Sequence, residues 1–291
     1  MTKPIRKAVI PVAGFGTRML PATKAMPKAM LPIVDKPAIQ YIVEEAAAAG
    51  AREILMIIGR GGGAIEDHFD RAPELEAALE RSHKDALLKT VCAAADIADI
   101  TFLRQKEMKG LGHAVLKARA FTGDEPFLVL YGDDVIIGED PVAAQLCRAY
   151  ERYGRPCVGI REVPREDIGK YSSMKLETLS DNLYHITDMI EKPAAGQEFS
   201  LFSILGRCLL TPEIYDILDR TQPGAGGELQ LTDAMAECAR TSGMTGVDFT
   251  GRRYDMGNKF GVMQAQVETA LHHPEIGEAF RAYLKGIARE L

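Results

Sequence analysis

The stretch AGFGTRMLPATKAMPKAMLPIVDK, residues 13–36, combines a glycine turn with several cations and directly follows an apolar run over 8–12. Gly14 and Gly16 lack Cβ atoms, so backbone N–H groups there can approach an anion closely. Arg18 then offers a planar fork of donors, and the stretch holds one acid, Asp35. This combination predicts a loop that wraps a polyphosphate at the end of a strand.

Two better-known glycine loops do not fit the spacing. A dinucleotide fingerprint GxGxxG needs a glycine at position 19, where Met19 stands. A Walker A loop needs Gly-Lys followed by Ser or Thr five residues after its first glycine, and the sequence contains no such stretch. A dinucleotide-dependent oxidoreductase is therefore a remote alternative, because the lysines that follow Met19 also argue against it.

Apolar runs alternate with helical patterns through the first part of the chain. The strand-like runs are 8–12, 53–58, 99–103, 127–131 and 156–160. Unbroken apolar runs between helices indicate an α/β fold whose sheet is buried on both faces. From about 170 to 210 the long helices disappear, and further strands are predicted there.

Helix signals are also specific. The first helix carries an apolar stripe from Ile39 onward and should stop at Gly50. Helices are predicted to begin near 141 and 212, where Asp140 and Thr211 would act as caps before proline. A last helix is predicted over about 275–289, with an apolar stripe expected to pack against the core of its own chain.

Composition narrows the class of protein. The 291 residues suffice for one large domain or two modest ones, and one is favoured. The net charge is −6, yet residues 1–36 hold seven basic groups and one acid, which suits a small anionic substrate better than nucleic acid. The five cysteines form no C-x-x-C pair and no apolar signal segment precedes the first strand, so reduced, metal-free thiols and a cytoplasmic location are expected. No apolar run approaches the ~20 residues that cross a bilayer, so no membrane attachment is expected.

Several further segments with distinctive residues follow the opening loop along the chain. They are GRG (59–61) with AIEDHFD (64–70), Gln105 followed by GLGHA (110–114), GDD (132–134), EKP (191–193), GGELQLTDA (226–234) and YDMGNK (254–259). Together with G-x-G-T-R, Pro27-Lys28 and LPIVDKP, this set resembles the sugar-1-phosphate nucleotidylyltransferases. The details are most similar to bacterial members that use UTP and glucose 1-phosphate.

This resemblance covers nearly the whole chain and implies a nucleotide-diphospho-sugar transferase type of fold. That fold is a Rossmann-like three-layer αβα domain with a mixed, mostly parallel central sheet. It implies a single domain over 1–291, with a nucleotide-binding half over about 1–165 and a sugar-binding half with C-terminal helices over about 166–291. The implied reaction is Mg²⁺-dependent transfer of a uridylyl group from UTP to glucose 1-phosphate, giving UDP-glucose and pyrophosphate. A homo-oligomer, dimer or tetramer, is also implied.

A carboxylate that follows the run 127–131 is the leading metal-ligand candidate. Ligands of α/β sheets gather at the carboxyl ends of strands, where Asp133 stands, although Asp133 could equally shape or cap a turn. Mg²⁺ prefers one or two carboxylates together with phosphate oxygens and water. The resemblance implies that Asp133 and Asp255 hold the metal, with Asp134 as a supporting or turn residue.

The resemblance also implies roles for other side chains. Arg18 would grip the β and γ phosphates, Lys28 the α-phosphoryl and leaving group, and Lys192 the sugar phosphate. The nucleotide-binding residues would be Ala13, Gly14, Gly16, Thr17, Gln105 and Gly110. The sugar-binding residues would be Glu191, Tyr171 and Ser172. Because proline follows Lys192, its backbone is expected to be extended.

Three positions depart from the family's pattern. Ala29 replaces a glutamate that contacts the base, Ser172 replaces a glycine, and Leu201 replaces an asparagine. These changes leave open another sugar 1-phosphate or dTTP as substrate, or a catalytically weak paralogue that binds a nucleotide-sugar and regulates a partner. The six histidines have no paired ligand spacing, so none is assigned a metal or catalytic role.

Overall fold

A nine-stranded mixed sheet forms the centre of the molecule, in the order β5-β4-β1-β6-β11-β8-β12-β10-β9. The computed structural model describes residues 3–290, apart from the side chain of Ala225. The strands are β1 (Lys7–Val12), β4 (Glu53–Ile58), β5 (Asp99–Arg104), β6 (Phe127–Leu130), β8 (Cys157–Glu162), β9 (Ser172–Ser180), β10 (Leu183–Glu191), β11 (Phe202–Leu210) and β12 (Met244–Asp248). In this sheet β11 and β10 run against the other strands, which confirms the predicted mixed, mostly parallel sheet.

Two short ladders and a series of helices surround this sheet. β2 (Pro32–Ile33) pairs with β3 (Lys36–Pro37), and β7 (Asp134–Ile137) pairs with β13 (Arg252–Asp255). The helices are α1 (Ala38–Ala48), α2 (Gly63–Phe69), α3 (Pro73–Arg81), α4 (Asp85–Ala95), α5 (Leu111–Leu116), α6 (Arg119–Thr122), α7 (Val142–Tyr153), α8 (Glu213–Arg220), α9 (Leu231–Thr241), α10 (Lys259–Ala270) and α11 (Gly277–Ile287). Across residues 3–290, none of these helices has the length and apolarity that crossing a membrane would require.

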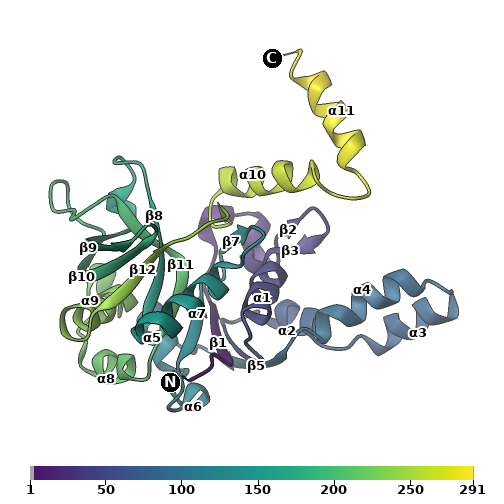
Figure 1. The fold of residues 1–291 in the computed structure, drawn as a ribbon. Coiled ribbons are helices and arrows are strands. Elements are labelled where there is room, and N and C mark those ends of the chain that lie inside the picture. Colours follow the sequence, from purple (N-terminus) through teal and green to yellow (C-terminus); the bar gives the residue numbers. More distant parts are fainter. Residues whose placement is uncertain (1–2, 291) are drawn as a thin grey trace.

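The central strands are buried on both faces, as their unbroken apolar runs predict, whereas the edge strand β5 is only half-buried. Along β4, Ile54, Met56 and Ile58 join the core on the side of α1 and α7. Leu55 and Ile57 alternate with them and join the core on the side of α5, α8 and α9. Because successive side chains of a strand point to opposite faces, this alternation requires two cores, and the three-layer αβα fold is confirmed (Figure 1).

The predicted helix caps are wrong. The Asp140 carboxylate binds Arg148 at 2.5 Å instead of capping α7, and the buried Thr211 hydroxyl has no hydrogen-bond partner among residues 3–290. The N-terminus of α7 is satisfied from another element, because Ala143 N–H donates to Glu45 Oε1 of α1 at 3.0 Å. A local motif therefore gave way to a tertiary contact between two helices that cover the same face.

Helix α11 forms close to its predicted place but does not pack as predicted. Within α11, Gly277 is the buried residue, and Tyr283 is 62% exposed. Figure 1 shows α11 standing away from the body beyond α10, and the α3–α4 hairpin reaching out on another side. The expectation that the last apolar stripe packs into its own core is therefore wrong, because the turn after α10 carries the helix outward.

Candidate active site

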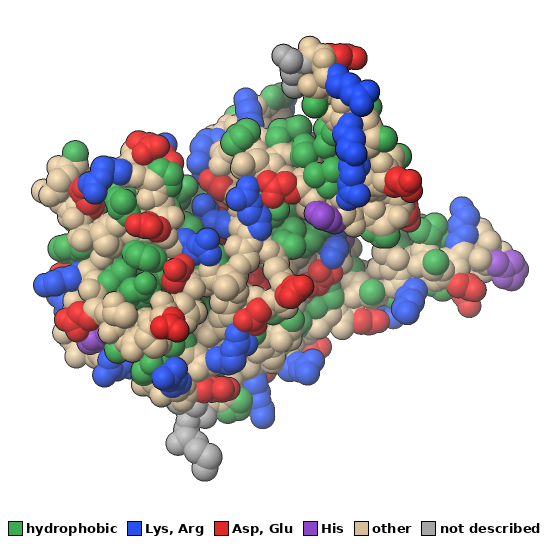
Figure 2. All heavy atoms as spheres, turned by 45° about the horizontal axis from the view of Figure 1, so that its top comes forward, with side chains coloured by type: hydrophobic (Ala, Val, Ile, Leu, Met, Phe, Trp, Pro, Cys, Tyr) green, Lys and Arg blue, Asp and Glu red, His purple; other side chains and the backbone are tan. Residues whose placement is uncertain are grey.

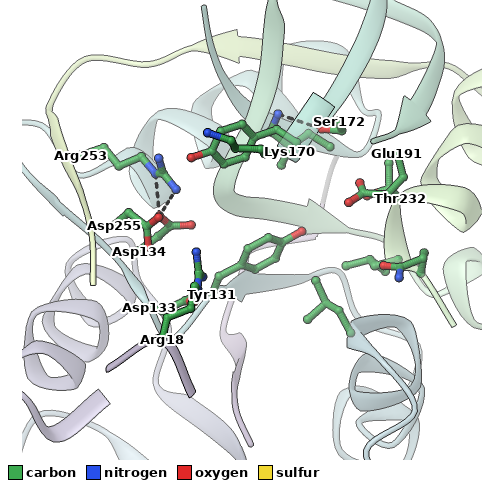
Figure 3. Close-up of a pocket in the computed structure, with 15 residues that line it drawn as sticks. Arg18, Tyr131, Asp133, Asp134, Lys170, Ser172, Glu191, Thr232, Arg253 and Asp255 are labelled. Atoms are coloured by element: carbon green, nitrogen blue, oxygen red, sulfur yellow. Dashed lines mark hydrogen bonds and ion pairs between the residues drawn. The ribbon is translucent and has the colours of Figure 1, made fainter. Parts of the chain in front are cut away.

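The carboxyl ends of β1 and β6 meet at a close contact that opens onto a cavity. A Cβ atom on Gly132 would lie 2.2 Å from Val12 Cγ1, so a glycine is needed where β6 ends beside β1. Beyond this contact lies a cavity of about 260 Å³, here called the central pocket (Figure 3). Its lining residues are Arg18, Leu111, Tyr131, Asp133, Asp134, Lys170, Tyr171, Ser172, Glu191, Ile204, Gln230, Leu231, Thr232, Arg253 and Asp255.

The two predicted metal ligands face one small space beside Gly257. A Cβ atom on Gly257 would lie 2.8 Å from Asp255 Oδ1 and 3.3 Å from Asp133 Oδ2. The backbone links the same two segments, since Met256 N–H donates to the Asp133 carbonyl at 2.8 Å. Gly257 N–H also donates to Asp255 Oδ1 at 2.7 Å, which orients that carboxylate. The fold thus brings together two aspartates that lie far apart in the sequence.

Two predicted cations adjoin this pair of carboxylates. Lys28 forms an ion pair with Asp133 Oδ2. Arg18 Nη2 would lie 2.7 Å from a Cβ on Gly257, and within residues 3–290 its guanidinium makes no hydrogen bond or ion pair. Gly16 has a positive φ of 63° and lies against the Lys28 side chain, while its carbonyl accepts a hydrogen bond from Thr23 Oγ1 at 2.8 Å. The glycine turn therefore fixes where Lys28 leaves the backbone.

A third aspartate in the pocket is held by an arginine that the sequence analysis did not single out. Arg253 Nε donates to Asp134 Oδ1 at 2.6 Å, and both side chains line the pocket (Figure 3). Burial raises the pKa of Asp134 to about 6, with Asp133 and Asp255 adding to the rise and Arg253 opposing it. Arg253 also lies 5.6 Å above the Tyr171 ring. The pairing of Asp134 with Arg253 follows from the β7–β13 ladder.

The far wall of the pocket carries the predicted sugar-side residues. Glu191 and Thr232 lie opposite the aspartates, with Tyr131 between them (Figure 3). Burial raises the pKa of Glu191 above its ordinary value, while a hydrogen bond with Thr232 and the charge of Lys192 oppose the rise. The Ser172 hydroxyl accepts from Ile204 N–H at 3.2 Å and lies 3.3 Å from Ser203 Oγ. Ser172 therefore forms part of the wall and is held by its neighbours.

Lys192 has a different backbone conformation from the one predicted. Its φ is 47°, in the left-handed region, although the following proline was expected to enforce an extended backbone. The reason lies at the end of β10, where Lys192 N–H donates to the Tyr171 carbonyl at 2.8 Å and the chain turns. Its ammonium lies 3.9 Å from Glu191 Oε1 and outside the lining of the pocket. Lys170, which sequence reasoning missed, lines the pocket instead.

A second, smaller cavity lies behind the glycine turn. It measures about 190 Å³, and we call it the glycine-loop pocket. Its lining residues are Val12, Ala13, Gly14, Phe15, Thr23, Lys24, Ala25, Met26, Pro27, Gly59, Arg60, Gly61 and Gly62. Ala13 and Gly14 thus line a cavity, whereas Gly16 and Thr17 line neither pocket.

Gln105 and Gly110 lie at the end of β5 and contact each other. Gln105 is 7% exposed, and its Nε2 lies 3.5 Å from the Gly110 carbonyl and 2.9 Å from His113 Nδ1. The segment GGELQLTDA supports this loop, since Gly112 N–H donates to the Leu229 carbonyl at 2.8 Å. His113 was given no role from the sequence, because an isolated histidine carries no signal of its partner.

Two of the three departures from the family's pattern lie away from the pockets. Ala29 is 2% exposed and packs into the core beside α1, because the turn Lys28–Met30 directs its Cβ inward. Leu201 packs with Val142, Val163 and Phe249 in a small apolar cluster. Ala29 therefore lines neither the central pocket nor the glycine-loop pocket, and Ser172 is the departure that lines the central pocket.

A buried ion pair stabilises the strand end that carries Asp133 and Asp134. Arg207 of β11 is 1% exposed and donates to both Glu45 carboxylate oxygens, with Nη2 at 2.6 Å from Oε2. The same Nη2 donates to the Asp134 carbonyl at 2.9 Å. A charge this deeply buried needs such a complete set of partners. The strand end that presents Asp133 and Asp134 is thereby fixed to α1 and β11.

Comparison with known proteins agrees with this geometry. Residues 7–283 match the family model described as Nucleotidyl transferase. A UTP–glucose-1-phosphate uridylyltransferase of Staphylococcus epidermidis is 47% identical over 283 residues, which cover 97% of this chain and 98% of the relative. A crystal structure of UDP-glucose pyrophosphorylase complexed with UDP-glucose has a TM-score of 0.84 and 39% identity, covering 92% of this chain and all of that one. A UTP-bound enzyme of Acinetobacter baumannii has a TM-score of 0.89 and 33% identity, covering 96% and 98%.

Proposed function

Because the chain belongs to the nucleotidyl transferase family, we propose that it transfers a uridylyl group from UTP to glucose 1-phosphate, giving UDP-glucose and pyrophosphate. In this reaction an oxygen of the sugar phosphate attacks the α-phosphorus of UTP, and the bond to the leaving pyrophosphate breaks. The nucleophile is already an anion, so the protein mainly has to align two anions and offset their charge.

The observation that carries the proposal is the division of the central pocket into two ends. Arg18, Asp133 and Asp255 lie at one end, and Glu191 lies at the other (Figure 3). A triphosphate bound beside Arg18 and a sugar hydroxyl bound beside Glu191 would place a sugar phosphate between them. The pocket thus suits two substrates that meet at phosphorus.

The cations would act on the nucleotide. Arg18, whose guanidinium is unpaired within residues 3–290, would bind the β and γ phosphates through its planar fork. Lys28 would leave Asp133 or bridge from it to the α-phosphoryl group, where negative charge builds as pyrophosphate departs. Ala13, Gly14, Gly16 and Thr17 would approach the phosphates and base through the backbone, and Gln105 and Gly110 would contact the base.

The remaining roles concern the sugar. Glu191 would accept hydrogen bonds from sugar hydroxyls, with Tyr171 and Ser172 shaping the wall beside it. Lys192 would bind the sugar phosphate, which requires its exposed side chain to turn toward the pocket. Lys170 is a further cation at that wall.

The two aspartates fit a magnesium ion. Mg²⁺ takes one or two carboxylates from a protein and completes its octahedron with phosphate oxygens and water. Asp133 and Asp255 face one space, so the protein would supply two carboxylates to the ion. Within residues 3–290 no group of three or more His, Cys, Asp or Glu side chains forms a metal site made by the protein alone. When bound, the ion would neutralise charge on the triphosphate and the leaving group. Asp134 is already occupied by Arg253.

Pyrophosphate release with a panel of nucleotides and sugar phosphates tests the proposal. UTP with glucose 1-phosphate should give the highest kcat/KM, and chelation of Mg²⁺ should abolish turnover. Asp133→Asn should remove most activity, whereas Asp96→Asn at the exposed C-terminal end of α4 is the matched control. A preference for a purine nucleotide over both UTP and dTTP would reject the pyrimidine assignment.

The same panel separates the two alternatives that the sequence left open. A higher kcat/KM with dTTP or another sugar 1-phosphate would keep the reaction and change the substrate. Binding of UDP-glucose without turnover of any pair would indicate a regulatory paralogue. Arg18, Asp133 and Asp255 line one pocket and Lys28 forms an ion pair with Asp133, and this set of residues supports a working enzyme.

We also propose that the chain forms a homo-oligomer through α11. The helix presents an apolar stripe with Phe280 and Tyr283, and its one buried residue is Gly277. Figure 2 shows a row of cations along this helix with hydrophobic side chains beside it. A helix of this length is marginal in water without packing, so a second copy of the chain is the partner that we assign to it.

A further inference from the structure

We propose that His113 sets the base selectivity of the enzyme by holding the Gln105 amide with its carbonyl oxygen toward the pyrimidine. The inference rests on the proposed function, in which Gln105 contacts the base. His113 would act through Gln105 and is therefore a positioning residue.

The hydrogen bonds around Gln105 leave one orientation of its amide. The Gly110 carbonyl can only accept, so the Gln105 side-chain atom 3.5 Å from it must be the nitrogen. The same nitrogen lies 2.9 Å from His113 Nδ1. An amide nitrogen has only protons to offer, so Nδ1 must accept and the imidazole proton must sit on Nε2.

The imidazole is suited to this accepting role. Burial lowers the pKa of His113, and the charges of Lys117 and Lys109 lower it further, against a smaller opposite effect of Glu107. The neutral ring is therefore the main form near pH 7, with Nδ1 free to accept. A charged ring would turn Nδ1 into a donor and oppose the Gln105 nitrogen.

Both partners are fixed on rigid elements. The Gln105 backbone N–H donates to the Ile58 carbonyl at 2.9 Å, which ties it to the end of β4. His113 lies in α5, next to Gly112, where a Cβ atom would lie 2.8 Å from the Leu229 carbonyl. Gln105 and His113 are therefore held at hydrogen-bonding distance, and the amide nitrogen stays the donor and Nδ1 the acceptor.

With both amide protons directed at Gly110 and His113, Gln105 presents Oε1 as an acceptor. Within residues 3–290 no hydrogen bond to this oxygen is formed, and it is not among the buried unpartnered atoms. The imide N3–H of uracil is a donor and matches an acceptor, whereas N3 of cytosine carries no proton and would face the oxygen unpaired. An unpaired buried acceptor costs binding energy, so cytosine is disfavoured.

The test compares UTP and CTP as substrates with glucose 1-phosphate. The parent should prefer UTP, and His113→Phe should lower the UTP to CTP ratio of kcat/KM by about tenfold or more, since only the weak 3.5 Å contact with the Gly110 carbonyl then holds the amide. His113→Gln supplies an acceptor again and should keep the ratio within about threefold of the parent. His272→Phe, at an exposed position near the end of the chain, is the matched control and should leave the ratio unchanged.

Each other outcome overturns the inference. If His113→Phe lowers the rates with UTP and CTP equally, the role is only structural. If the parent shows no preference for UTP over CTP, the Gln105 amide does not recognise the imide N3–H of uracil. If no pyrimidine nucleotide is turned over with glucose 1-phosphate, the proposed function itself fails, and this outcome is distinct from the other two.

A spectroscopic measurement on the parent protein needs no variant to fold. Histidine ¹⁵N chemical shifts at neutral pH should show His113 with an unprotonated Nδ1 and a protonated Nε2. The opposite tautomer, or a charged ring, would overturn the inference whatever the kinetics show.

Discussion

Lys28 and Asp133 form an ion pair, so each satisfies the charge of the other. Arg18 differs, because its guanidinium makes no ion pair within residues 3–290 and is ready for an anion. A triphosphate and a metal ion would therefore change the partners of Lys28 and Asp133 together. After this change of partners, the charge of Lys28 would act mainly on the leaving pyrophosphate.

Replacing Lys28 should affect the rate more than substrate binding. We expect Lys28→Ala to lower kcat by roughly 10²–10³-fold, because a preorganised charge at the leaving group is lost. Steady-state kinetics with UTP and glucose 1-phosphate measure this effect, and Lys84→Ala on the exposed turn after α3 is the matched control. Near-parental turnover of Lys28→Ala would show that the lysine has only a structural role.

Glu191 should make the folded protein less stable at neutral pH than a neutral side chain would. Its pKa is raised in the folded state by burial, so ionisation favours the unfolded chain once the pH exceeds the ordinary value of 4.5. Glu191→Gln should therefore raise Tm by roughly 1–3 °C at pH 8. The gain should shrink as the pH falls through the folded pKa and vanish below 4.5, where both states are protonated. An equal change in Tm at pH 8 and below pH 4.5 would contradict this account.

The residues that the sequence could predict are those carried by contiguous motifs. Asp133 follows a strand and Asp255 lies in a recognisable segment, so their meeting could be expected. Arg253, His113 and Lys170 could not, because the residues that flank each of them in the sequence do not show which side chain or cavity it will meet. The pairing of Arg253 with Asp134 arises only when β13 joins β7.

At the scale of elements, strands were predictable because burial on both faces leaves an unbroken apolar run. Helix ends were less so. Asp140 and Thr211 stand where caps often stand, yet Arg148 takes the first and nothing within residues 3–290 binds the second. The N-terminus of α7 is capped by Glu45 from α1, and a contact of that kind leaves no local trace in the sequence.

For helix α11 the sequence predicts the helix but not its packing, because an apolar stripe does not show which surface covers it. If a second copy covers it, deletion of residues 277–291 should lower the oligomeric mass seen by sedimentation velocity and leave kcat per chain within about threefold, since α11 lines neither pocket. Tyr283→Glu should have the same effect, with Lys285→Glu as the control. An unchanged oligomer after deletion would show that α11 is not the interface.

At the scale of the whole molecule, the two halves of the site are parts of one sheet. β6 of the first half pairs with β11 of the second, and β8 of the first half lies between β11 and β12. The buried pair Glu45–Arg207 joins α1 to β11 across the same boundary. We therefore propose that residues 1–291 fold as a single cooperative domain rather than as two units.

Breaking the buried pair should test this proposal. Arg207→Ala leaves Glu45 charged and unpaired in the core, and we expect a loss of about 3–5 kcal/mol in the free energy of unfolding. The matched control is Arg220→Ala, whose ion pair with Glu237 is largely exposed and should contribute at most about 1 kcal/mol. Urea unfolding followed by circular dichroism and by tyrosine fluorescence should give one coincident transition in the parent and in both variants. Two transitions, with Arg207→Ala shifting only one of them, would mean that the halves unfold independently in spite of their shared sheet.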